Sequence, residues 1–160
     1  MTGLALFTAF HVLLSIVGIL TGLVMAYGLL NSQPYGRWTV AFLVTTGATT
    51  LTGFLFPFHG FTPAIGVGII STLILVLAVA ARYAFQLRGF WRPTYIVSAL
   101  TAFYLNCFVF VVQAFQKVPA LHALAPAGSG ATFSLVQGIV LLSFLVLGYL
   151  AVKSFRLKAA

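Results

Sequence analysis

Five long apolar runs limit what this chain can fold into, because each is almost free of charged residues. A helix rises about 1.5 Å per residue, so about 20 residues cross the roughly 30 Å hydrocarbon layer of a bilayer. An unpaired backbone group in lipid costs several kcal/mol, and the runs lack the strict alternation of a barrel strand, which leaves helices as the expected form. The runs are residues 4–30, 38–56, 64–85, 94–115 and 133–152.

The composition also indicates that the chain is surrounded by lipid. Hydrophobic residues make up 62% of the chain and charged residues 5%, and the mean hydropathy is +1.16. A soluble fold of 160 residues could not bury so many apolar side chains in its interior. The five runs leave no stretch long enough for an extramembrane domain. We therefore predict an all-α membrane protein, a bundle of about five transmembrane helices that forms a single domain over residues 1–160.

The chain contains 8 Lys and Arg but no Asp or Glu. Paired-carboxylate catalysis, carboxylate proton relays, Ser-His-Asp triads and Ca²⁺ or Mg²⁺ sites are therefore excluded unless a partner supplies the acid. No catalytic motif is recognisable, which argues against an enzyme. The single cysteine, Cys107, cannot form a disulfide within the chain.

The cations fall mainly on one side of the predicted bundle, with only Lys117 on the other. The positive-inside rule then puts the N-terminus outside and the C-terminus in the cytoplasm of a multi-pass protein of the cell inner (plasma) membrane. We expect the cations to face anionic headgroups on the cytoplasmic side rather than nucleic acid. The cations of this side are Arg37, Arg82, Arg88, Arg92, Lys153, Arg156 and Lys158.

Small and polar residues recur at spacings of three and four in the first run. The stripe consists of Thr8, His11, Ser15, Gly18 and Gly22. Such a stripe faces protein, because small residues let membrane helices approach and hydroxyls share hydrogen bonds. We expect the first helix to pack antiparallel to the second and the third to the fourth. The stripe should then meet the face of the fourth helix that carries Asn106 and Gln113 at the bundle centre.

All three histidines fall in the outer half of the predicted topology. Histidine is the commonest metal ligand and the usual axial ligand of haem. The pattern predicts metal ligation by His11, His59 and His122, in a site for haem, copper or a quinone-like cofactor. Asn106, Gln113 and Gln137 are the amides predicted to support it.

Two alternatives stay open. The polar residues can serve helix packing alone, in an accessory or assembly subunit that binds a partner membrane subunit or forms a homo-oligomer. The threonine- and glycine-rich second and third helices can instead line a route for a neutral or anionic solute, since a cation route would need an acidic ring.

Overall fold

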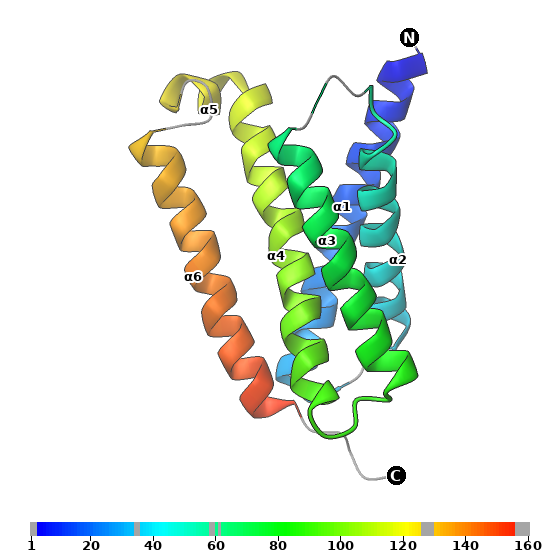
Figure 1. Cartoon of the computed structure of the whole chain (residues 1–160). Helices are drawn as coiled ribbons and strands as arrows, with labels where there is room; N and C mark the ends of the chain where they lie inside the picture. Colours follow the sequence, from blue (N-terminus) through cyan, green and yellow to red (C-terminus); the bar gives the residue numbers. More distant parts are fainter. Residues whose placement is uncertain (1–2, 34–35, 58–59, 61, 126–129, 156–160) are drawn as a thin grey trace.

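The computed structural model describes residues 3–33, 36–57, 60, 62–125 and 130–155. In this part of the chain the structure is helical and contains no strand (Figure 1). The helices are α1 (Gly3–Leu30), α2 (Gly36–Gly53), α3 (Pro63–Val79), the π-helical turn η1 (Ala80–Ala84), α4 (Trp91–Lys117), the short α5 (Pro119–Leu124) and α6 (Ala131–Ser154).

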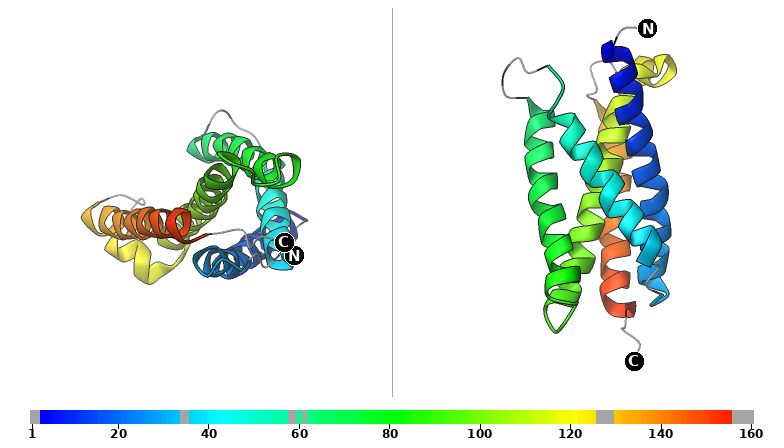
Figure 2. Two further views of the ribbon diagram at one scale, coloured as in Figure 1. Left: turned by 90° about the horizontal axis from the view of Figure 1, so that it is seen from below. Right: turned by 90° about the vertical axis from the view of Figure 1, so that its right-hand side faces the viewer.

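Four helices among the described residues are long and apolar enough to cross a membrane: α1, α3 continued by η1, α4 and α6. The prediction of an all-α membrane bundle is confirmed. The second predicted span, α2, does not reach the same hydropathy because its sequence is rich in threonine and has Arg37 in its first turn. It nevertheless lies beside α1 and α3 along the bundle (Figure 2).

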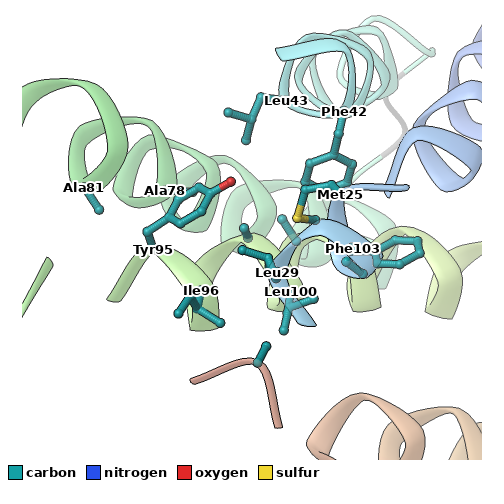
Figure 3. Packing of buried hydrophobic residues seen from close by; sticks show 14 of the residues in the cluster. Met25, Leu29, Phe42, Leu43, Ala78, Ala81, Tyr95, Ile96, Leu100 and Phe103 are labelled. Carbon is teal, nitrogen blue, oxygen red and sulfur yellow. The ribbon is translucent and has the colours of Figure 1, made fainter. Parts of the chain in front are cut away.

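The predicted helix pairing is confirmed. Helix α1 packs antiparallel to α2, and α3 packs antiparallel to α4 (Figures 1 and 2). Helix α4 is central, since it contacts α1, α3 and α6. The buried core takes residues from α1, α2, α3, α4 and α6, and Figure 3 shows part of it. There the buried Phe103 ring makes edge contacts with Phe42 of α2 and Phe144 of α6.

Helix α6 packs mainly through its C-terminal part. Ala151 and Phe155 are buried in the core, and the Arg92 guanidinium of α4 donates to the Phe155 carbonyl. The Ser32 hydroxyl after α1 donates to the Ser154 carbonyl at 2.7 Å. Toward its N-terminus α6 diverges from α4 (Figure 1), and within the helix only Gln137 and Ala151 are buried.

The two ends of the bundle differ in charge. The α1–α2 connection, the turn between η1 and α4 and the end of α6 lie at one end, whereas the start of α1 and α5 lie at the other (Figure 1). Of the cations in the described residues, only Lys117 belongs to the second end, and we call the first the cationic end. Arg156 and Lys158 lie outside the described residues.

Candidate functional site

The small-residue stripe of α1 meets Asn106 of α4, as predicted. The Ser15 hydroxyl donates to Asn106 Oδ1 at 2.8 Å, and Asn106 Nδ2 donates to the Ser15 carbonyl at 3.4 Å. Asn106 is only 8% exposed, so these contacts supply hydrogen-bond partners to a buried amide. The N-terminal end of the stripe is different, because the Thr8 hydroxyl is exposed and donates within its own helix to the Leu4 carbonyl.

Gly18 lies where α1, α2 and α4 come together. A Cβ atom at this position would stand 2.8 Å from Asn106 Nδ2 and 3.2 Å from Thr46 Oγ1, so only glycine fits without displacing them. The Thr46 hydroxyl is buried and has no hydrogen-bond partner within the described structure. We call Ser15, Gly18, Thr46 and Asn106 the three-helix junction.

His11 lies one helical turn before Ser15 on α1, against α2. Its Nδ1 atom is 2.8 Å from Thr52 Oγ1, and its ring meets the Phe56 ring edge-on with the centroids 5.2 Å apart. The Thr52 hydroxyl donates to the Ala48 carbonyl at 2.7 Å, so its single proton is used there. We infer that His11 Nδ1 carries the proton and donates to Thr52, so that Nε2 is unprotonated and carries a lone pair.

The other predicted ligands do not join His11 in the described structure. His122 is exposed on α5, because Val118 has extended backbone geometry and Pro119 starts a separate short helix. His59 lies outside the described residues. Across the described residues no three His or Cys side chains gather in a group that could hold a metal ion, so the predicted metal and haem site has no support there.

The three amides also face different surroundings. Gln137 Nε2 of α6 donates to the Phe108 carbonyl of α4 at 3.2 Å, while Gln137 Oε1 is buried with no partner in the described structure. Asn106 and Phe108 stand two residues apart on α4 and so point to nearly opposite sides of the helix. Gln113 is exposed.

Most threonines of α2 bond within their own helix. The hydroxyls of Thr45, Thr49 and Thr50 donate to the carbonyls four residues earlier at 2.7–2.9 Å. This back-bonding satisfies a hydroxyl in lipid without another helix. It gives no support to a solute route lined by α2 and α3.

Sequence reasoning did not find the polar contact at the cationic end. The Tyr95 hydroxyl of α4 is buried beside Thr39 of α2 and Arg82 of η1. The available signal was Arg82 itself, which lies inside an apolar run of a chain that has no acid to pair with it.

Comparison of the chain with protein-family models, with curated proteins and with solved structures finds no match.

Proposed function

We propose that this integral membrane protein is a non-catalytic accessory or assembly subunit of a larger membrane complex. In this proposal α2 is a fifth span, the cationic end is cytoplasmic by the positive-inside rule, and the membrane is the cell inner membrane. One observation carries the proposal: three of the polar groups that could have formed a reactive site, His11, Asn106 and Gln137, are used in contacts between helices of the chain. These contacts are His11 with Thr52, Ser15 with Asn106, and Gln137 with the Phe108 carbonyl.

Helix α6 supplies a surface suited to a partner. Gly138 and Gly148 have open space where a Cβ atom would stand, so no helix in the described part of the chain covers them. Leu142, Leu145 and Tyr149 are more than 60% exposed and, with Gly138, recur at spacings of four, three and four. Small residues within such a stripe are typical of places where membrane helices approach closely. A partner helix that carries carboxylates would also complement a chain with 8 cations and no acid.

The proposal is tested by native purification from source membranes in mild detergent. We expect another membrane protein to copurify stoichiometrically with the wild-type chain, and Gly138→Leu with Gly148→Leu to abolish this because leucine would keep the partner helix away. The thermal stability of the isolated variant should be unchanged, since both glycines face open space. Gly47→Leu on α2, another position with open space, is the matched control and should retain the partner. A monodisperse homo-oligomer without a second chain contradicts the proposal.

A second candidate function rests on the inferred protonation of His11. When Nδ1 carries the proton and donates to Thr52, the lone pair of the imidazole is on Nε2. This tautomer can ligate haem iron or copper through Nε2. A quinone carbonyl would instead require a donor at Nε2. The observation therefore favours a metal-containing cofactor over a quinone-like one.

This candidate predicts a spectroscopic signal. Purified protein should show a haem absorption band or stoichiometric copper, and His11→Ala should remove it. Thr52→Ala should weaken it, because the ring would lose the acceptor that orients it. His122→Ala, which changes an exposed residue of α5, is the control and should leave the signal intact. Colourless, copper-free wild-type protein rejects the candidate.

A further inference from the structure

Arg82 is the half-buried cation of η1, whereas Arg37, Arg88 and Lys153 are exposed. Its guanidinium carbon lies 5.3 Å from the centre of the Tyr95 ring and 5.7 Å from that of Tyr83. The backbone of η1 forms a π turn, in which the Phe85 amide donates to the Ala80 carbonyl at 3.0 Å. Because the whole chain lacks Asp and Glu, none of its side chains can supply a counter-charge for Arg82.

The Tyr95 hydroxyl gives an independent sign of a missing group. Tyr95 is 0% exposed, and its hydroxyl faces Thr39 and Arg82 but completes no hydrogen bond of normal geometry in the described structure. Figure 3 shows the ring beside Ala78 of α3, with the hydroxyl directed toward the side where Leu43 of α2 lies. A buried hydroxyl without a partner is unfavourable, so an acceptor at this point would stabilise the fold.

An apolar groove lies near this pair of residues: Arg82 and Tyr95 are not among its walls, but Tyr83, the chain neighbour of Arg82, is one of them. The groove is open toward the surrounding lipid, has a volume of about 440 Å³, and lies between α2 and α3. Its walls are Val40, Leu43, Val44, Val79 and Tyr83. Tyr83 follows Arg82 directly, while Val79 lies one turn farther from the cationic end. The groove therefore extends from the level of the guanidinium toward the middle of the bundle.

We propose that this groove binds one anionic phospholipid. The Arg82 guanidinium donates to the phosphate oxygens, for which its planar fork is well shaped. As Arg82 turns toward the groove, it uncovers the Tyr95 hydroxyl, which is fully buried without lipid, and this hydroxyl then donates to one of the same oxygens. An acyl chain lies along Val44 and Val79. Charge complementarity selects the lipid: a zwitterionic headgroup brings its own cation, whereas an anionic one supplies the counter-charge that the chain lacks.

The test uses the full-length protein in neutral detergent, with dioleoyl phosphatidylglycerol and dioleoyl phosphatidylcholine as probes. Native mass spectrometry should show one retained phosphatidylglycerol, and the same lipid should raise the melting temperature more than phosphatidylcholine does. Arg82→Gln should weaken phosphatidylglycerol binding roughly tenfold, which corresponds to about 1.4 kcal/mol, close to the lower limit of about 1.5 kcal/mol for a hydrogen bond to a charged group. Arg88→Gln, which removes an exposed cation of the same end, should change it less than twofold.

Tyr95→Phe separates lipid recognition from a structural role. Without lipid this variant should melt at or above the wild-type temperature, because it removes an unpartnered buried hydroxyl. With phosphatidylglycerol it should show a smaller stabilisation than the wild type. Val44→Trp should fill the groove and reduce retention of the lipid while Arg82 is intact.

Three results would overturn the proposal. Equal losses for Arg82→Gln and Arg88→Gln would indicate diffuse attraction to negative charge. Equal retention of phosphatidylcholine would remove the headgroup preference. Stabilisation by inorganic phosphate that matches phosphatidylglycerol, with no effect of Val44→Trp, would indicate a phosphate site without a lipid.

Discussion

Gly22→Ala is expected to lower the free energy of unfolding by about 2–3 kcal/mol, which is large for the addition of one methyl group. A Cβ atom at Gly22 of α1 would stand 2.7 Å and 2.8 Å from two ring carbons of Phe103. The ring cannot simply turn aside, because Phe103 is 2% exposed and is held by Phe42 and Phe144. The two helices would have to separate, which loosens the α1–α4 contact along its length. Unfolding in mixed micelles of mild and denaturing detergent measures the change.

Two companion variants show whether the ring is the cause. Gly47→Ala on α2 adds the same methyl group where open space is available, and should leave stability unchanged or raise it by up to about 1 kcal/mol through helix propensity. Phe103→Leu combined with Gly22→Ala should cost less than the sum of the two single changes, because the smaller side chain makes room. Strict additivity of the two changes would show that the close approach does not determine the cost.

The pairing of the helices follows from the sequence because it depends on local features. Long apolar runs fix the helices, short connections make neighbours antiparallel, and the spacing of Ser15, Gly18 and Gly22 identifies the face of α1 that packs. The contact with Asn106 was predictable for the same reason, since a buried amide in a membrane helix needs a partner on another helix.

Convergence of side chains was not predictable in this way. Whether His122 points inward depends on the backbone at Val118 and Pro119, which starts a separate helix and leaves the imidazole exposed. A topology predicted from sequence gives the depth of a side chain in the membrane, but it does not say whether the side chain points into the bundle or away from it. The Tyr95 and Arg82 contact was missed for a related reason: it joins η1 to α4 through a π turn, and a 3.6-residue periodicity does not predict which way the residues of such a turn face.

Asn106→Leu is expected to lower the free energy of unfolding by about 2 kcal/mol, although it makes a membrane helix more apolar. The variant loses both hydrogen bonds with Ser15, each worth about 1 kcal/mol between membrane helices. It also places branched methyl groups beside Gly18 and Thr46, where the planar amide fits. Gln113→Leu is the matched control on the same helix, and it should change stability by less than about 0.5 kcal/mol because Gln113 is exposed.

A double-mutant cycle with Ser15→Ala assigns the loss to this contact. If the hydroxyl and the amide stabilise each other, the combined Ser15→Ala and Asn106→Leu variant should be about 1 kcal/mol more stable than the sum of the single effects predicts. Wild-type stability of Asn106→Leu would mean that the amide is not needed to hold α1 against α4. Asn106 would then be free to serve a ligand, and the accessory-subunit proposal would lose one of the three contacts that support it.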